Sequence, residues 1–310
     1  MKAVVFAYSN VGDRCLRVLR AGGVEVAAVV THRDRPEETA WFASVAETAM
    51  ELGIDCLYGE DRDERGLDAL VAGLRPDVIF SFYYRAMLPM AVLDHAPLGA
   101  FNMHGSLLPK YRGRAPTNWA VLHGETETGA TLHRMVAAPD AGDIVDRCAV
   151  PILPDDTARQ VFDKVTVAAE TVLWRTLPAI AERRVPRLVN DLGAGSYFGA
   201  RTPEDGRIDW HRPAATVYNL VRAVAPPYPG AFTDFGAVRV VIAAARLSTA
   251  SPPGAALARQ PGLTVVAGRI VGVCGDGRCI DVHSLLEQGQ PVTAARLCEL
   301  TRTVPLREAS

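Results

Sequence analysis

The stretch AVVFAYSNVGDRCLRVLRAGGVEVAAVVT, residues 3–31, decides the fold. Residues 3–8 form a continuous apolar run rich in β-formers, which is typical of a strand buried in a parallel sheet. The spacing predicts a turn over residues 9–12, a helix over 13–21 and a second strand over 24–31. Because parallel strands joined by a helix form a right-handed crossover, this stretch predicts a βαβ unit.

The same alternation continues downstream. Amphipathic helices are predicted over residues 39–52 and 65–74, and strands over 55–57 and 77–82. Repeated alternation of this kind indicates an α/β fold with a doubly wound, mostly parallel sheet. The first turn lacks the three glycines that let a pyrophosphate approach a helix N-terminus, so we do not expect a nicotinamide cofactor.

The rest of the chain predicts a second domain. Further elements are expected as helices over 117–123, 157–181 (capped by Asp156 or Thr157) and 216–224, and as strands over 99–103, 129–136, 144–152, 238–243, 263–270 and 279–282. A Gly- and Ser-rich segment over residues 190–203 separates the two parts. We therefore expect a catalytic domain over residues 1–203 and a small, mostly β domain over 204–310.

Composition and charge exclude several classes of protein. The 310 residues are 49% hydrophobic and 22% charged, with a net charge of −2. This balance gives no general reason to expect nucleic acid or an anionic membrane as partner. The first residues resemble a strand more than a signal peptide, and no apolar run approaches the ~20 residues of a membrane span, so a cytoplasmic location is expected.

The six cysteines are scattered and indicate reduced thiols. Cys274 and Cys279 could form half of a metal site, but no second Cys or His pair completes a tetrahedral set. A turn between two strands is the preferred interpretation, and no metal is expected.

The densest group of reactive side chains lies between Gly99 and Ile144. If residues 99–103 form a strand, Asn102 and His104 share a face because alternate residues do. An amide donor and an imidazole aimed at one point suit acyl transfer, in which an oxyanion develops and a proton moves. A lone histidine is more often structural, so the pair makes this chemistry feasible without proving it.

Three cations, Lys110, Arg112 and Arg114, lie within five residues of a loop that could receive a phosphate or carboxylate, although such runs are often simply solvated. Asp140 opens a turn in which Asp is common for backbone reasons alone. If that turn folds onto His104, its carboxylate would fix the tautomer of the imidazole and raise its pKa.

Two further segments are ambiguous. His133 alternates with apolar neighbours, and a structural hydrogen bond is its preferred interpretation. The segment Tyr83–Pro89 follows a predicted strand, where ligands bind in open α/β sheets. It could equally start a surface helix with two aromatic rings packed beneath it, and the residues alone favour neither interpretation.

The run NMHGSLLPKYRGRAP, residues 102–116, followed by Asp-Ala-Gly from Asp140, resembles the signature of folate-dependent formyltransferases. Within that family, other segments are similar to the formyltransferase part of the bifunctional polymyxin resistance proteins, which formylates UDP-4-amino-4-deoxy-L-arabinose for lipid A modification. These segments are VFAY (5–8), VIFSFYYR (78–85), NW (118–119), GETETG (124–129), TLHRMV (131–136) and RAVA (222–225).

The resemblance implies a Rossmann-like first domain and a small, open OB-like β-barrel after it. It implies that His104 transfers protons, Asn102 stabilises the oxyanion, Asp140 raises the imidazole pKa and Arg114 contacts substrate. It implies 10-formyltetrahydrofolate as co-substrate, without a metal. The folate would lie against Ala86, Met87, Leu88, Val136, Ala137, Ala138, Pro139 and Asp140.

The expected reaction transfers a formyl group from this folate to the amine of a UDP-amino-sugar. Alternatives are a methionyl-tRNA formyltransferase, a dTDP-amino-sugar N-formyltransferase and a non-catalytic binding module. Residues 204–310 hold eleven Arg, no Lys and nine Asp or Glu. The resulting net charge of +2 is small for binding a polyanion such as tRNA, which depends on several contacts to phosphates. We expect small-molecule partners, no nucleic acid and no membrane insertion. The sequence does not fix the oligomeric state, and a homo-oligomer is one possibility.

The chain stops at Ser310, without the decarboxylating dehydrogenase that follows in the bifunctional proteins. We therefore expect a stand-alone transferase, with a separate chain supplying the oxidation step.

Overall fold

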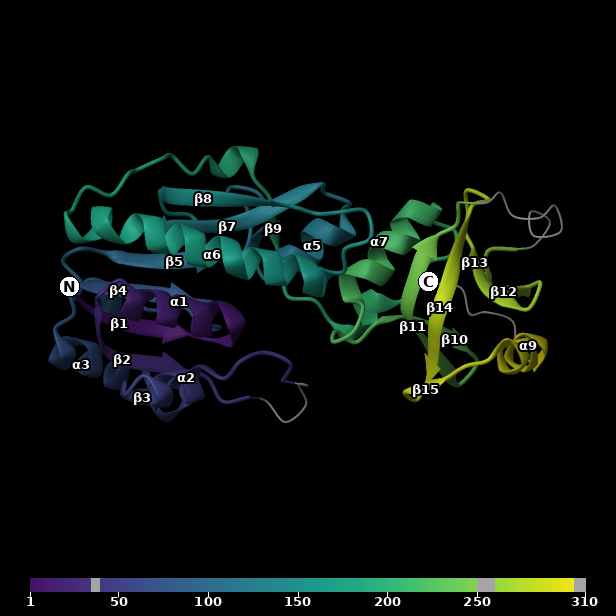
Figure 1. The fold of residues 1–310 in the computed structure, drawn as a ribbon, viewed down its shortest axis with the longest axis horizontal. Helices are drawn as coiled ribbons and strands as arrows, with labels where there is room; N and C mark the ends of the chain where they lie inside the picture. The colour runs from purple at the N-terminus through teal and green to yellow at the C-terminus, as the bar shows by residue number, and fades with distance from the viewer. Residues whose placement is uncertain (35–39, 250–259, 304–310) are drawn as a thin grey trace. The chain divides into compact units, whose positions relative to one another are not determined.

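The computed structural model describes residues 1–34, 40–249 and 260–303 (Figure 1). The chain divides into two compact units. The first comprises Met1–Pro116, Glu127–Pro151 and Phe162–Gly199. The second comprises Thr117–Thr126, Ile152–Val161 and the chain from Ala200 onward, so it includes two short segments from before residue 203.

A seven-stranded sheet forms the centre of the first unit, in the order β3-β2-β1-β4-β5-β7-β8. Its strands are β1 (Lys2–Ala7), β2 (Glu25–Thr31), β3 (Cys56–Tyr58), β4 (Val78–Phe82), β5 (Ala100–His104), β7 (Glu127–Arg134) and β8 (Ile144–Pro151). The pairs from β3 to β5 are parallel, whereas β7 runs antiparallel to both β5 and β8. The predicted mostly parallel, doubly wound sheet is confirmed.

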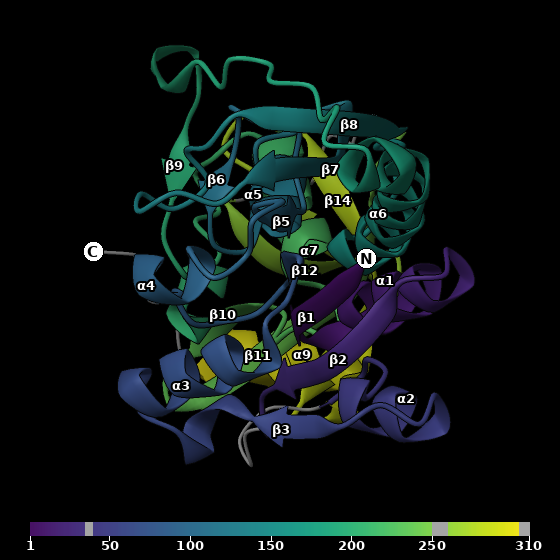
Figure 2. The same ribbon diagram turned by 90° about the vertical axis from the view of Figure 1, so that its left-hand side faces the viewer.

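Helices cover both faces of this sheet (Figure 2). The helices of the first unit are α1 (Ser9–Ala21), α2 (Val45–Glu51), α3 (Glu64–Leu74), α4 (Met90–Leu93) and most of α6 (Ala158–Ala181). Helix α5 (Pro116–Leu122) falls mainly in the second unit. Helix α1 follows β1 without the predicted four-residue turn, because Tyr8 alone is the N-cap. Helix α2 is shorter than the predicted 39–52. Ser44 is its N-cap and accepts a hydrogen bond from the Glu47 N–H, so the helix begins there. Thr39, the first residue of the predicted helix, lies outside the described residues.

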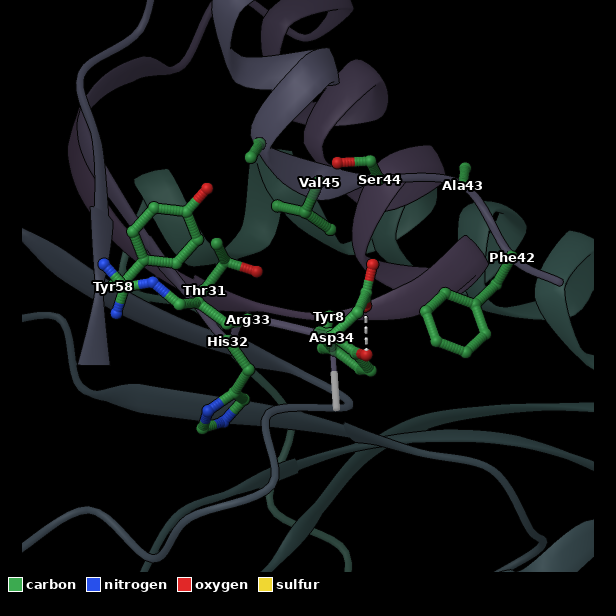
Figure 3. A pocket seen from close by; sticks show the side chains of 11 residues that line it. Tyr8, Thr31, His32, Arg33, Asp34, Phe42, Ala43, Ser44, Val45 and Tyr58 are labelled. Atoms are coloured by element: carbon green, nitrogen blue, oxygen red, sulfur yellow. Dashed lines mark hydrogen bonds between the residues drawn. The ribbon is translucent and has the colours of Figure 1, made fainter. Parts of the chain in front are cut away.

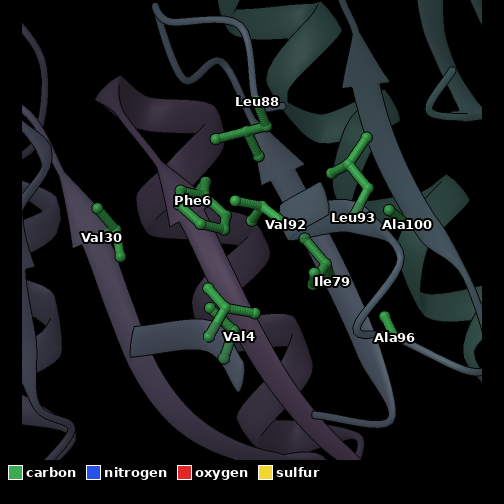
Figure 4. Close-up of a cluster of buried hydrophobic side chains, with 10 residues drawn as sticks. Val4, Phe6, Val30, Ile79, Leu88, Val92, Leu93, Ala96 and Ala100 are labelled. Carbon is green, nitrogen blue, oxygen red and sulfur yellow. The ribbon is translucent and has the colours of Figure 1, made fainter. Parts of the chain in front are cut away.

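One apolar cluster fixes the middle of the sheet (Figure 4). Val4 and Phe6 of β1 and Ile79 of β4 are fully buried in it, beside Val92 of α4 and Leu88. Each such side chain contributes ~1.5–3 kcal/mol to folding. The cluster therefore holds the two central strands β1 and β4 and the segment after β4 together.

The second unit is built on an antiparallel sheet with strand order β10-β11-β14-β13-β12. Its elements from residue 203 on are η3 (Pro203–Gly206), α7 (Ala214–Val224), β10 (Ala231–Phe235), β11 (Val238–Leu247), β12 (Gly262–Val266), β13 (Arg269–Val273), β14 (Cys279–Glu287), β15 (Gln290–Pro291) and α9 (Ala294–Thr303). The expected mostly β second part is confirmed. The single strand predicted over 263–270 is wrong, because Ala267 and Gly268 take positive φ and turn the chain into a hairpin.

Two smaller points complete the fold. Cys274 and Cys279 flank a turn in which the Cys274 N–H donates to the Arg278 carbonyl at 2.9 Å, as the preferred interpretation of this pair predicted. Within the described ranges, no helix combines the length and the apolar character that crossing a bilayer requires.

Candidate active site

Asn102 and His104 lie at the carboxyl end of β5. Asn102 pairs in register with His133 of β7, and His104 pairs with Thr131. Because alternate residues of a strand share a face, the two side chains project to the same side, as the sequence predicted. His104 is buried and Asn102 is half-buried, so the pair lies under the surface of the edge.

One carboxylate oxygen organises the site. Asp140 Oδ1 lies 3.4 Å from His104 Nδ1, 3.4 Å from His133 Nε2 and 3.4 Å from Asn102 Nδ2. The other oxygen, Oδ2, accepts a hydrogen bond from the Gly113 N–H at 2.9 Å. The structure thus brings together the three predicted catalytic residues, although Asp140 follows Asn102 by 38 positions.

The turn that carries Asp140 is held by a side chain that no sequence motif indicates. Asn190 is buried, and its amide donates to the carbonyls of Asp140 at 3.0 Å and Gly142 at 3.1 Å. Asp140 has a φ of 50°, a strained value for a residue other than glycine. At Gly142 a Cβ would lie 2.0 Å from the Arg134 carbonyl oxygen, so only glycine fits. No sequence signal identifies Asn190, since it lies fifty residues away in an irregular segment.

His133 makes the predicted structural hydrogen bond and also reaches the site. Its Nδ1 lies 2.8 Å from the Arg134 carbonyl, which can only accept, so Nδ1 carries a proton. In the neutral ring, Nε2 then accepts a hydrogen bond from Asn102 Nδ2 at 3.0 Å. His133 therefore fixes one amide hydrogen of Asn102 and leaves the other facing Asp140. This second contact depends on the pairing of His133 with Asn102 across β7 and β5, which the sequence does not reveal.

Burial controls the protonation of His104. Desolvation lowers the pKa of this imidazole below 6.5, while the Asp140 charge and the Tyr111 carbonyl act in the opposite direction and are outweighed. Asp140 thus acts to raise the pKa of His104, in the direction that the resemblance implies, and burial is the larger effect. Since Nε2 donates to the Tyr111 carbonyl at 2.8 Å, the neutral ring has its lone pair on Nδ1, facing Asp140.

Asp140 itself is firmly ionised. Burial acts to raise its pKa, but the adjacent imidazoles of His104 and His133 and the Gly113 N–H together hold it well below the usual range for a carboxyl group. The site at neutral pH therefore contains an anionic carboxylate beside a neutral imidazole. A proton arriving at Nδ1 would be stabilised at once by the adjacent negative charge.

The basic loop after β5 is tied down by its own polar groups. Ser106 donates to the Lys110 carbonyl at 2.6 Å, and the Tyr111 N–H donates to Ser196 Oγ at 2.9 Å. Strand β6 (Arg112–Gly113) pairs with β9 (Tyr197–Phe198), which fixes the Gly113 N–H that Asp140 uses. The loop is therefore part of the scaffold of the site.

Its cations have different environments. Arg114, the predicted substrate contact, is exposed and donates to the Arg85 carbonyl at 3.2 Å. Nε of the half-buried Arg112 has no hydrogen-bond partner within the described ranges. An anion reaching the loop would meet the exposed guanidinium of Arg114, whereas the Arg112 Nε atom is buried.

The residues predicted to contact folate divide into two groups. Ala86 and Met87 are exposed, as are residues Val136, Ala137, Ala138 and Pro139 before Asp140. Leu88 is different, because its side chain is buried in the apolar cluster of the sheet, and only its backbone is left for a ligand. Tyr84 also packs on that cluster, so the aromatic residues beneath this segment are structural in part.

A separate pocket of about 180 Å³ opens at the carboxyl ends of β1, β2 and β3 (Figure 3). Tyr8, Thr31, His32, Arg33, Asp34 and Tyr58 form one part of its lining, and Phe42 and residues 43–46 form the rest. Tyr8 donates to Asp34 Oδ1 at 2.5 Å within it. Of its polar residues, Tyr8 ends the segment VFAY (5–8) quoted for the family resemblance, and Thr31, His32, Arg33, Asp34 and Tyr58 belong to no motif that the sequence alone singles out.

Comparison with known proteins adds family information. A family model described as formyl transferase matches residues 1–177, and one described as formyl transferase, C-terminal domain, matches residues 201–300. Among solved structures, the sugar 3N-formyl transferase WlaRD, in the presence of dTDP and 5-N-formyl-THF, is 19% identical with a TM-score of 0.70. The match covers 91% of this chain and 97% of that one.

Two more solved structures are similar. The Helicobacter canadensis N-formyltransferase, in complex with folinic acid and dTDP-3-aminofucose, is 19% identical with a TM-score of 0.71, covering 91% of this chain and 98% of that one. Glycinamide ribonucleotide transformylase 1 from Symbiobacterium toebii is 24% identical with a TM-score of 0.52, covering 61% and 94%. At these identities the structural matches demonstrate a shared fold.

Proposed function

This chain belongs to the formyl transferase family, and from that premise we propose that it transfers a formyl group from 10-formyltetrahydrofolate to the primary amine of a nucleotide-linked sugar. The observation that carries the proposal is the convergence of the Asn102 amide and the His104 imidazole on one carboxylate oxygen of Asp140. A donor amide, a base with an available lone pair and a fixed anion are the groups that amine acylation requires.

The amine nitrogen attacks the formyl carbon, and a carbon–nitrogen bond forms while the carbonyl oxygen becomes an oxyanion. Asn102 donates its second amide hydrogen to that oxyanion, since the first is bonded to His133 Nε2 at 3.0 Å. The oxyanion can compete for this hydrogen because the existing contact to Asp140 Oδ1 is long, at 3.4 Å.

His104 accepts the proton that the attacking amine must lose. Its Nδ1 is the only ring nitrogen with a lone pair, because Nε2 donates to the Tyr111 carbonyl. The imidazolium formed there is stabilised by Asp140 and then gives the proton to the folate nitrogen as the carbon–nitrogen bond to the donor breaks. The lowered pKa of His104 keeps the ring neutral before reaction, as a base must be.

Two observations support 10-formyltetrahydrofolate as the formyl donor. The exposed residues Ala86, Met87 and those from Val136 to Pro139 flank the carboxyl edge and offer a small apolar surface. Two structurally similar sugar N-formyltransferases bind a formylated folate or folinic acid. In this proposal Asp140 and its neighbours contact the donor, and no metal takes part.

For the acceptor we propose UDP-4-amino-4-deoxy-L-arabinose, on the resemblance of segments 78–85, 124–129 and 131–136 to the corresponding formyltransferases. Arg114 is the proposed substrate contact. The similar structures with dTDP and with dTDP-3-aminofucose make a dTDP-amino-sugar the competing acceptor. Lipid A modification and polymyxin resistance follow only if the arabinose derivative is the substrate.

The experiment is a competition between acceptors. Purified protein is mixed with 10-formyltetrahydrofolate and equal concentrations of UDP-4-amino-4-deoxy-L-arabinose, dTDP-3-aminofucose and methionyl-tRNA, and each product is identified by mass. Formylation of the UDP-arabinose derivative in preference to the others supports the proposal. Preference for the dTDP-sugar or the tRNA overturns the acceptor, and folate binding without transfer to any amine overturns the reaction.

A further inference from the structure

The loop after β4 is held at its main chain by side chains from two other segments. The Arg85 N–H donates to His32 Nε2 at 3.1 Å, and the Arg85 carbonyl accepts from the Arg114 guanidinium at 3.2 Å. Arg85 directly precedes Ala86 and Met87, the exposed residues assigned above to the formyl donor. The conformation of the donor loop therefore depends on the acceptor atom that His32 supplies.

His32 is fixed in the form that this hydrogen bond needs. Its Nδ1 lies 2.6 Å from Glu60 Oε1, so Nδ1 carries the proton and Nε2 offers its lone pair to the Arg85 N–H. The ring stacks on Tyr84 with centroids 4.1 Å apart and meets Tyr8 edge-on at 5.8 Å. Glu60, just after β3, thus sets the tautomer through which the end of β2 supports the loop after β4.

We propose that His32 is a positioning residue for formyl-donor binding, acting through its Nε2 on the Arg85 N–H. His32 is not one of the proposed catalytic residues and is not among the residues assigned to the folate. It acts through the main chain of the loop after β4, which carries Ala86 and Met87. The proposal deepens the folate-dependent reaction proposed above and rests on it. The hydrogen bond ties the end of β2 to the loop after β4, two segments 53 residues apart in the chain.

Two variants at position 32 separate the acceptor atom from the packing of the ring. His32→Phe keeps an aromatic ring against Tyr84 and removes the acceptor, whereas His32→Gln loses the ring and keeps an acceptor at similar reach. We expect His32→Phe to raise KM for 10-formyltetrahydrofolate about tenfold with kcat changed less than about twofold, because an amide loses its partner. His32→Gln should stay within about threefold of the wild type.

The state of the loop can be measured without any activity. Trypsin cleaves after Arg85 when the loop leaves its hydrogen-bonded conformation, so the rate of cleavage between Arg85 and Ala86 reports the fraction of open loop. We expect about tenfold faster cleavage there in His32→Phe and wild-type cleavage in His32→Gln. His95→Phe is the matched control, because His95 is a partly exposed histidine paired with Asp68.

Each outcome of these experiments supports or overturns the role of His32. Unchanged KM and unchanged cleavage after Arg85 in His32→Phe overturn the proposal, and so does a His32→Gln variant impaired as strongly as His32→Phe. If His32→Phe does not fold, as judged by its thermal transition, Glu60→Ala replaces it, with an expected rise in KM of about threefold. If the wild type transfers no formyl group, the proposed function fails, while cleavage after Arg85 still tests the contact.

Discussion

The two buried histidines beside Asp140 occupy similar places and have different tasks. His104 at the end of β5 and His133 in β7 each lie 3.4 Å from the same carboxylate oxygen. His133 donates a hydrogen bond from Nδ1 to the Arg134 carbonyl and accepts one at Nε2 from Asn102, so both ring nitrogens are used within the protein. His104 keeps a lone pair that faces the anion. Hydrogen-bond partners, more than distance to a carboxylate, therefore decide which imidazole can act as a base.

Removal of the base should have the largest effect. His104→Ala is expected to lower kcat ~10²–10⁴-fold, because proton transfer from the amine loses its acceptor. Single-turnover formyl transfer measures this loss, and His95→Ala serves as the surface-histidine control. A His104→Ala enzyme with near-normal turnover would remove the difference between the two histidines.

Loss of the oxyanion donor should come next. Asn102→Ala is expected to lower kcat ~10²–10³-fold, with a smaller change in KM, because the donated hydrogen bond strengthens in the transition state. Steady-state kinetics with varied folate separates the two parameters. A rise in KM alone would make Asn102 a binding residue.

His133 should matter less than either, and through Asn102. His133→Phe removes the acceptor that fixes the Asn102 amide, and we expect roughly a 10-fold fall in kcat, in line with the loss of one buried hydrogen bond. In the Asn102→Ala background the same substitution should have little further effect. A full multiplication of the two losses would show that His133 acts independently.

Acid pH should inactivate His104 as a base. Its pKa in the folded protein is lowered from 6.5 by burial, so the neutral, active ring is present above that lowered value and disappears as pH falls through it. The acid limb of kcat/KM should therefore fall about tenfold per pH unit and start below pH 6.5. An acid limb that starts above this point would indicate an imidazole favoured in its charged form.

The same shifts also affect stability. A histidine that resists protonation when folded makes the free energy of unfolding fall as pH drops below its unfolded pKa, here about 6.5. Asp140 has a depressed pKa, so its contribution is present above the unfolded value of 3.8 and is lost as pH falls through the folded one. Urea unfolding between pH 8 and pH 3 should therefore show two successive losses of stability, and a flat profile would contradict both shifts.

The smallest effect is expected at Asn190. Asn190→Ala removes two donors from the turn that carries Asp140 and should lower the free energy of unfolding by ~1–3 kcal/mol. The matched variant Asn219→Ala changes an amide of α7 that accepts from Arg222. If Asn190→Ala lost activity with unchanged stability, the turn would act on chemistry alone.

Local sequence patterns could predict the sheet because apolar runs and helical spacing determine strands and helices over short distances. They located β5, and therefore the common face of Asn102 and His104. They could not distinguish one long strand from the hairpin at Ala267 and Gly268, because both give the same apolar run. The helix before residue 52 was overextended because its start depends on a cap at Ser44.

The site was harder to predict where it depends on distant contacts. The approach of Asp140 to His104 could only be stated as a condition, since it depends on Asn190 and the Gly113 N–H. The influence of Asp140 on the pKa of His104 was predicted with the correct sign, but the sequence does not reveal the burial that outweighs it. His32 and Glu60 were missed because they meet only when β2 and β3 are side by side.

The central claim is that His104 and Asp140 work as one unit, and a double-mutant cycle tests it most directly. Single-turnover formyl transfer is measured for His104→Ala, Asp140→Asn and the double variant under one set of conditions. We predict that the double variant is no slower than the slower single variant, because residues of one catalytic unit are strongly non-additive. Losses that multiply in the double variant would contradict this claim.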